Sequence, residues 1–296
     1  LLHGLRAPAG IRVRDVEVPF FVVNAFTDRA FMGNPAGVVP DATPLDEEQM
    51  QLLAAELKCS ETAFVLPSSR AHYRIRFFTP LREVDLCGHA TVAAFSVLRR
   101  QGSVSQGQVT METGAGVLPI HIRGEQVFME QAAPRFKEAP VAPEEVAQAL
   151  RISPHEMDRH PLESVSTGLW SLPVPVARRR TLENMRPDFD AVAEVCRRCE
   201  VGALFVFTLD TLYPDCLVHA RCFAPLYGVQ EDPVTGTANG ALGAYLHRHG
   251  LLERNPYTAE QGYEMGRGGL VTVEVAPEKV RVGGGAYVAR QGTLYL

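Results

Sequence analysis

The sequence predicts a protein of two similar lobes that contain both helices and strands. The first observation behind this prediction is length, because 296 residues suit one large domain or two ordinary ones, each with its own core. The second is an internal repeat. The segment that begins at Gly88 recurs at Gly236, 148 residues later, and the two copies run without a gap to Gly102 and Gly250. Elements that recur in the same order indicate a duplicated unit.

The repeat also extends to residue identities. The matching positions are Phe78-Thr79-Pro80-Leu81 with Phe223-Ala224-Pro225-Leu226, and Ala90, Leu98 and Arg100 with Ala238, Leu246 and Arg248. The alternative is chance, because helices bounded by glycines are common in proteins that mix helices and strands. The shared order of several elements favours duplication.

Hydrophobic periodicity and turn residues predict the elements of the first half. Residues 20–26 form a β-branched and aromatic run, and a turn at 33–35 precedes a second extended run at 36–39. The spacing of Met50, Leu53 and Leu57 predicts an amphipathic helix with acidic residues in its first turn. Further along we expect strands at 63–66, 73–78, 109–112 and 117–122, an irregular segment at 80–86, and a helix from Gly88 to Leu98.

The second half is expected to follow the same order. It contains predicted helices at 143–150 and 189–199, strands near 172–176 and 203–209, and the repeated helix from Gly236. A duplicated unit implies an approximate twofold axis, which brings the N-terminal ends of the two repeated helices face to face. Each end presents unpaired N–H groups and a partial positive charge, so we expect a small carboxylate to bind between them.

The expected boundaries follow from the repeat. The first lobe covers residues 19–130 and is completed by about residues 286–296, and the second lobe covers 131–285. Residues 1–18 mix arginine, proline and glycine without a continuous apolar segment. This composition favours an extension or a cloning remnant over a signal peptide.

Composition and charge exclude several classes of protein. A net charge of −5 and a pI near 6.0 provide no basic field for nucleic acid. No apolar run approaches the roughly 20 residues of a membrane helix. With 46% hydrophobic and 21% charged residues, the chain is typical of globular proteins. The six cysteines lack a regular spacing, which favours free thiols and a cytoplasmic location.

No metal site or nucleotide site is expected from the motifs. Cys196 and Cys199 form the one C-x-x-C motif, but no second close pair accompanies them, so two thiols on a helix are favoured over a zinc or redox site. The glycine-rich segments at 266–269 and 283–285 match neither the P-loop nor the dinucleotide fingerprint. Tight turns explain these glycines better.

Glu61 is the candidate general acid/base. It lies between the end of a predicted helix and the apolar strand that contains Phe64. Burial there would suit a carboxylate to moving a proton on and off carbon. The alternative is an ordinary surface glutamate in a solvated turn.

His89 and Asp232 are candidates for holding a substrate. His89 lies at the positive end of the first repeated helix, where a neutral imidazole is favoured; a capping or packing role is an equal alternative. Asp232 lies four residues before Gly236, too early for a simple N-cap, and Pro233 holds it in an extended conformation. These features favour a functional role for Asp232.

Cys87 is a candidate thiolate, because a helix N-terminus lowers the pKa of a thiol. A racemase that uses two thiols needs a second cysteine at the matching place in the repeat. The residue there is Thr235, so a two-thiol mechanism is excluded.

Five motifs, in order, carry a family resemblance. They are Asn24-Ala25-Phe26 with Gly33-Asn34-Pro35-Ala36, Ser60-Glu61-Thr62-Ala63-Phe64, Phe78-Thr79-Pro80, Leu86-Cys87-Gly88-His89-Ala90-Thr91 and Glu231-Asp232-Pro233-Val234-Thr235-Gly236. Through them the chain resembles the phenazine-biosynthesis PhzF-like family over roughly residues 19–292. The resemblance implies an α+β fold of the diaminopimelate-epimerase type. In this fold two duplicated lobes each wrap a mostly antiparallel sheet around a central helix, and the ligand lies between them.

The resemblance also implies an activity. It is isomerisation without a cofactor, in the type enzyme of trans-2,3-dihydro-3-hydroxyanthranilate, with a glutamate that moves a proton between carbons. Glu61 occupies the position of that glutamate. The residues implied to bind the substrate are His89, Asp232, Thr237, Gly88 and Gly236, with possible support from Cys87, Thr235 and Arg267. Family habit suggests a homodimer.

The chain departs from the family at Thr237, where the family has a serine. The hydroxyl is kept, but the added methyl narrows the site. Two alternative functions remain at this stage. One is a racemase or epimerase of an amino or hydroxy acid, suggested by analogy of fold, and the other is a non-catalytic binding protein that retains the pocket.

Overall fold

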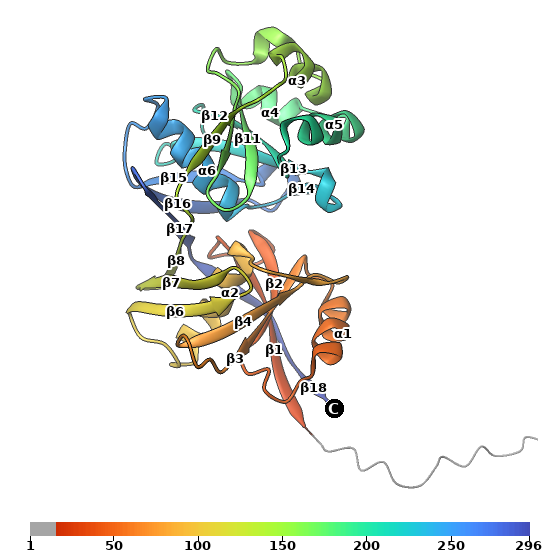
Figure 1. Cartoon of the computed structure of the whole chain (residues 1–296), viewed down its shortest axis with the longest axis vertical. Helices are drawn as coiled ribbons and strands as arrows, with labels where there is room; N and C mark the ends of the chain where they lie inside the picture. Colours follow the sequence, from red (N-terminus) through yellow and green to blue (C-terminus); the bar gives the residue numbers. More distant parts are fainter. Residues whose placement is uncertain (1–15) are drawn as a thin grey trace, which may run out of the picture.

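The structure is a computed structural model that describes residues 16–296. It confirms an α+β architecture, with two bodies that lie one above the other in Figure 1. Strand β8 (Gln126–Glu130) pairs with β17 (Lys279–Gly284) where the two bodies meet. Among the described residues, no helix combines the length and apolar character that a bilayer crossing requires.

The other elements of the first body are mostly strands. They are β1 (Glu17–Ala25), β2 (Asn34–Val39), α1 (Glu47–Leu57), β3 (Glu61–Leu66), β4 (Tyr73–Phe78), β5 (Glu83–Val84), α2 (Gly88–Arg100), β6 (Gly107–Thr113), β7 (Gly116–Arg123) and β18 (Ala286–Tyr295). Strand β18 is antiparallel to β1, so the C-terminal segment returns to the first body.

The second body contains more helices. Its elements are β9 (Arg135–Glu138), α3 (Pro143–Leu150), β10 (Glu163–Ser166), β11 (Trp170–Pro175), α4 (Arg179–Asn184), α5 (Phe189–Cys199), β12 (Ala203–Thr208), β13 (Val218–Ala224), β14 (Val229–Asp232), α6 (Gly236–Arg248), β15 (Tyr257–Gln261) and β16 (Gly269–Ala276). Short 3-10 helices cover Pro154–Glu156, Pro225–Tyr227 and Tyr263–Met265.

Strands of the two bodies pair in the same order. In the first, β2 is parallel to β3, β3 antiparallel to β4, β4 parallel to β6, and β6 antiparallel to β7. In the second, the same relations join β11 to β12, β12 to β13, β13 to β15, and β15 to β16. In each body a helix of 13 residues lies between the third and fourth strands of this series. It is α2, between β4 and β6, in the first body and α6, between β13 and β15, in the second.

These two helices lie within the strands of their own bodies. Helix α2 contacts β1, β2, β3 and β8, and α6 contacts β10, β11, β16 and β17. Both are rich in alanine and other small residues, which lets the surrounding strands approach closely. Helix α2 ends at Arg100, two residues beyond the predicted Leu98, and α6 ends at Arg248. Each is followed by a glycine in the left-handed region, Gly102 (φ 75°) and Gly250 (φ 70°).

Several short elements differ from the sequence prediction. Strands β5, β9 and β10 have two to four residues, too few for an alternating pattern to be read, and β5 falls in the segment expected to be irregular. Strand β1 begins at Glu17 and Val18 is buried, so the last two residues of the expected extension belong to the fold. The part of that extension at 1–15 lies outside the described residues.

Candidate active site

Glu61 and His89 meet at the start of β3 and α2. Oε2 of Glu61 lies 3.3 Å from Nε2 of His89, and the same nitrogen lies 3.1 Å from the hydroxyl of Ser60. The Glu61 side chain is 22% exposed, so it is not a freely solvated surface group. Its Oε2 is buried and has no well-aligned hydrogen-bond donor in the described structure. The carboxylate is therefore partly enclosed, and one of its oxygens is not occupied by a hydrogen-bond donor of the described residues.

Cys87 adds a thiol to this pair. Its Sγ lies 3.4 Å from Nδ1 of His89. Burial raises the pKa of the Cys87 thiol well above its usual range, and the negative charge of Glu61 adds to the effect. The lowering expected at a helix N-terminus is therefore outweighed, and Cys87 is held as a neutral thiol. The thiolate considered from the sequence is disfavoured for this reason.

The same three side chains form a possible group of metal ligands. The donor atoms of Glu61, Cys87 and His89 all lie within 4.8 Å of one another, and their types suit Zn²⁺. Binding of a metal here would release the proton of the Cys87 thiol, because a cysteine that binds a metal is a thiolate. Cys196 and Cys199 both lie on α5, as expected from the sequence, and are buried in the hydrophobic cluster of the second body. All six cysteines are buried and free.

Asp232 lies at the end of β14 and is fixed from both bodies. It accepts a hydrogen bond of 2.9 Å from Nδ2 of Asn34, which opens β2 in the first body, and another from the hydroxyl of Thr235. Nδ2 of Asn34 also donates to the carbonyl of Val234 at 2.8 Å. Burial raises the pKa of Asp232, although His89 and these two hydrogen bonds oppose the rise.

Gln261 holds the loop that leads into α6. Its Oε1 accepts from the backbone N–H of Thr235 at 3.0 Å and from Nδ2 of Asn239 at 2.9 Å. Its Nε2 donates to the Asp232 carbonyl at 3.0 Å and to the Thr235 hydroxyl at 3.1 Å. Thr235 thus joins Gln261 to Asp232 through its hydroxyl group.

The entrances of α2 and α6 lie next to each other. A Cβ atom on Gly88 would sit 3.6 Å from Oγ1 of Thr237, which places Thr237 opposite the first turn of α2. On the other side, a Cβ on Gly236 would lie 3.1 Å from the ring of Phe26, a residue of the first body. Neither helix has a side-chain cap hydrogen bond at its N-cap, Cys87 or Thr235. The first-turn N–H groups are therefore not used by side-chain caps.

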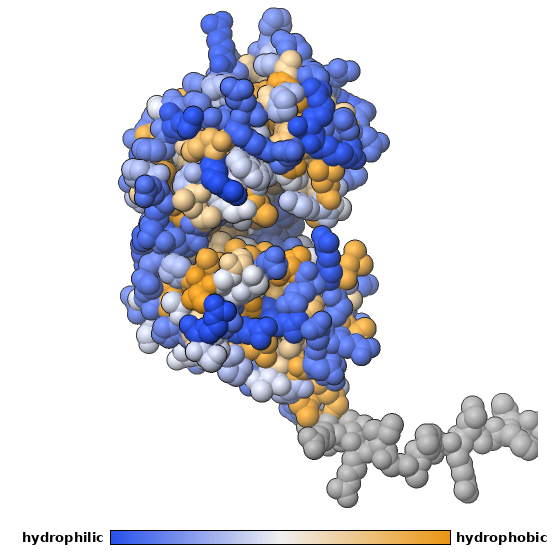
Figure 2. Space-filling model, viewed as in Figure 1, coloured by the Kyte–Doolittle hydropathy of each residue, from blue (hydrophilic) through white to orange (hydrophobic). Residues whose placement is uncertain are grey.

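Arg267 joins the two bodies near this site. Its Nε donates to the Gly33 carbonyl at 3.0 Å, and its Nη2 lies 3.4 Å from Oδ1 of Asn24 and from the Met32 carbonyl. Burial lowers the pKa of the guanidinium. Arg267 therefore holds the turn before Asn34, the residue whose amide reaches Asp232. Figure 2 shows that the molecule is hollowed where the two bodies face each other.

The structure brings Glu61, His89 and Cys87 together on one side of this region, and Asp232, Thr235 and Thr237 on the other. Sequence reasoning did not assign roles to Ser60, Asn34, Asn239 and Gln261. The first two stand inside the motifs already quoted, beside Glu61 and Gly33. Gln261 lies outside these motifs.

Comparisons with known proteins all relate this chain to one family. The family model described as phenazine biosynthesis-like protein matches residues 23–292. An uncharacterized isomerase of Clostridium acetobutylicum is 35% identical over 294 residues, which cover 93% of this chain and 97% of that protein. Curated relatives from Bacillus subtilis and Escherichia coli are likewise named uncharacterized isomerases.

Solved structures support the same grouping. The PhzF-family phenazine biosynthesis protein of Bacillus anthracis has a TM-score of 0.88 at 35% identity, with coverage of 95% of this chain and 100% of that one. A hydroxyproline epimerase from Agrobacterium vitis has a TM-score of 0.61 at 15% identity, covering 95% and 91%. The second likeness concerns the fold alone.

Proposed function

The chain belongs to the phenazine biosynthesis-like protein family and is an enzyme of the isomerase class, and we propose that Glu61 moves a proton between two carbons of a small carboxylic acid. The observation that carries this proposal is the Glu61–His89 pair, in which a partly enclosed carboxylate oxygen lies 3.3 Å from an imidazole and lacks an aligned donor. A general base needs that freedom to reach a C–H proton.

The substrate carboxylate would lie between the entrances of α2 and α6. The N–H groups near Gly88 and Gly236 belong to uncapped helix starts, which favour an anion. His89, Asp232 and Thr237 would orient the rest of the molecule by hydrogen bonds. Asp232 suits the task because Asn34 and Thr235 fix its position.

The proposed reaction needs no cofactor. Glu61 takes a proton from one carbon, the double-bond electrons shift, and the same carboxyl group returns a proton to another carbon. No electron pair leaves the substrate, so neither an oxidant nor a reductant enters the balance.

The proposal includes the duplicated fold. The strands of the two bodies pair in the same order, and each body has a helix of 13 residues at the same place in that order. Both observations support two lobes of the diaminopimelate-epimerase type. We place the first lobe at 19–130 with about 286–296, and the second at 131–285, because β18 pairs with β1. A cytoplasmic homodimer completes the proposal, and six unpaired thiols suit a reducing compartment.

A racemase or epimerase is the second candidate, favoured by one observation, the 3.4 Å contact of Cys87 with His89. A two-base mechanism would need a matching base across the site, where the chain has Thr235. The raised pKa of Cys87 also leaves little thiolate. These points favour Glu61 as the single base.

The test is proton exchange in D₂O. Small carboxylic acids, including trans-2,3-dihydro-3-hydroxyanthranilate, are first screened for thermal stabilisation, and binders are followed by NMR for deuterium at carbon. Glu61→Gln should lower exchange at least about 100-fold, because a general base contributes about 10²–10⁴-fold, while binding persists. Glu48→Gln, which changes an exposed glutamate of α1, is the matched control. Full exchange in Glu61→Gln would overturn the proposal, and binding without exchange in the wild type would indicate a binding protein.

A further inference from the structure

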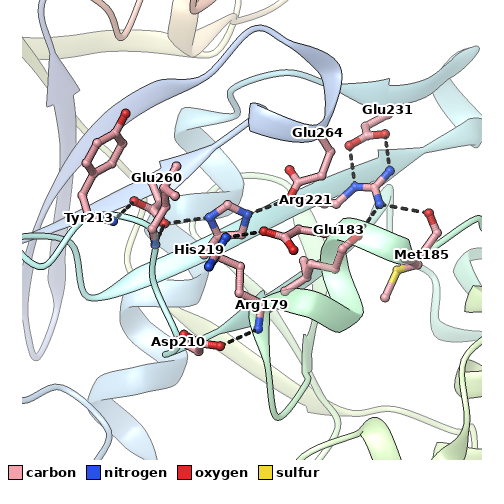
Figure 3. A network of polar contacts seen from close by, with 12 residues as sticks. Arg179, Glu183, Met185, Asp210, Tyr213, His219, Arg221, Glu231, Glu260 and Glu264 are labelled. Atoms are coloured by element: carbon pink, nitrogen blue, oxygen red, sulfur yellow. Dashed lines mark hydrogen bonds and ion pairs between the residues drawn. The ribbon is translucent and has the colours of Figure 1, made fainter.

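A second cluster of charged side chains lies in the second body, on the opposite face of the strands that carry Asp232 and Gln261. Glu231 precedes Asp232 on β14, and Glu260 precedes Gln261 on β15. Neighbouring residues of a strand point to opposite faces. Asp232 and Gln261 therefore belong to the candidate active site, and Glu231 and Glu260 belong to the network in Figure 3.

His219 is the centre of this network. Its Nδ1 lies 2.7 Å from Oε1 of Glu260, and its Nε2 lies 2.7 Å from Oε1 of Glu264. Burial acts to lower the pKa of His219, but the hydrogen bonds and charges of the two glutamates raise it to about 9. His219 is therefore an imidazolium that uses both of its N–H groups within the protein.

Arg221 is satisfied in the same way. Nε and Nη2 each donate to Glu231 at 2.8 Å, and Nη1 donates to the backbone carbonyls of Leu182 and Met185. Its side chain is 7% exposed. Arg221 and His219 thus form a fixed floor, because both N–H groups of His219 and four of the five N–H groups of Arg221 are used within the protein.

Above this floor lies a cavity of about 440 Å³. This volume falls within the range of small-molecule sites, about 300–1,000 Å³. Arg179 and Arg186 line one part of it, and Tyr263 and Glu264 line another. The cavity is open to small molecules independently of the region around Glu61.

Two buried polar atoms at this cavity have no partner among the described residues. They are Oε2 of Glu264, on a side chain that is 8% exposed, and Nε of Arg179. A buried polar atom without a partner is costly, so such atoms call for a ligand or ordered water. One atom accepts a hydrogen bond and the other donates one, so the cavity offers an anionic and a cationic contact at once.

Most charged groups of the cluster are paired with one another. The positive groups are Arg179, Arg186, His219 and Arg221, and the negative groups are Glu183, Asp210, Glu231, Glu260 and Glu264. The oxygen of Glu264 and the nitrogen of Arg179 that lack partners therefore decide which ligand fits. A ligand with one ammonium and one carboxylate would meet both.

We propose that this cavity is a second ligand site, which binds a free α-amino acid. The ammonium group donates to Oε2 of Glu264, and the carboxylate accepts from Arg179, with Arg186 nearby. The ring of Tyr263 faces the side chain of the amino acid. This site does not depend on the function proposed for Glu61.

The test is binding of the twenty standard L-amino acids, offered singly to the full chain and followed by calorimetry. At least one should bind, and its decarboxylated amine and its des-amino acid should bind at least about tenfold more weakly, as expected for loss of a charged hydrogen bond. Arg179→Gln and Glu264→Gln should each weaken binding of the amino acid by a similar factor. Arg180→Gln is the matched control, because Arg180 is the exposed neighbour of Arg179 on α4.

Two further measurements keep the outcome decisive. If Glu264→Gln does not fold, Arg179→Gln alone decides, since Arg179 is partly exposed and its loss leaves the His219 network intact. Glu61→Gln must leave binding unchanged, because otherwise the amino acid occupies the region between the two bodies. Absence of binding, equal binding of the des-amino acid, or full binding by both cavity variants would each overturn the proposal.

Discussion

Asn34 donates a side-chain hydrogen bond to Asp232 across 198 residues of sequence. The bond joins the first strand pair of one body to the loop before α6 in the other, and a second bond from the same amide reaches the Val234 carbonyl. One buried side chain therefore helps to hold both the contact between the two bodies and the position of Asp232, a candidate substrate contact.

Asn34→Ala should lower both stability and turnover. The substitution removes the donor to Oδ1 of Asp232 and to the Val234 carbonyl, which costs about 1–3 kcal/mol for each buried atom left unpaired. The free energy of unfolding in urea is the measurement. Asn184→Ala, at an exposed position of α4, is the control and should change it little. Unchanged stability and exchange in Asn34→Ala would show that the bond has no role in placing Asp232.

Local sequence patterns predicted the elements that carry the site. The glycines that begin and end α2 and α6 set both helices, and the ordered motifs pointed to Glu61, His89 and Asp232. They did not predict the Asn34–Asp232 bond, because no local spacing specifies a contact across 198 residues.

The protonation state of Cys87 shows a second reason why local sequence patterns do not predict the whole site. A rule about helix ends predicts a lowered thiol pKa, but the actual pKa is raised because the residue is buried beside Glu61. Burial depends on the packing of the whole body, which a short motif does not contain. The same holds for His219, which no motif singled out and which lies between two glutamates from a distant segment.

His219 should make stability depend on pH. Its folded-state pKa of about 9 lies above the unfolded value near 6.5. The stabilisation is therefore fully present below about pH 6.5 and is lost as pH rises through about 9, by about 3 kcal/mol at most. Unfolding in urea from pH 6 to 9.5 measures it. His219→Gln should flatten this part of the profile, whereas His155→Gln, at an exposed position, should retain it.

Thr237→Ser should widen the range of substrates. The change keeps the hydroxyl that faces Gly88 and removes a methyl that lies near Gly168. Bulkier cyclic acids should then gain in kcat/KM relative to small ones, with a gain of about 10-fold or more for a ligand that the methyl obstructs. Competition between a large and a small acid measures the ratio. The exposed Thr43→Ser serves as control, and an unchanged ratio would mean that Thr237 does not limit size.

Cys87→Ser distinguishes the two candidate mechanisms. Loss of a catalytic base costs about 10²–10⁴-fold, so an epimerase that used Cys87 would lose nearly all activity. With Glu61 as the base, the loss should stay below about tenfold, because a hydroxyl can replace the neutral thiol beside His89. Alkylation gives an independent reading: the raised pKa of Cys87 predicts slow reaction with iodoacetamide at pH 8, and faster reaction once urea exposes the thiol. Rapid alkylation of the native protein at Cys87, together with a large loss in Cys87→Ser, would transfer the role of base from Glu61 to the thiol.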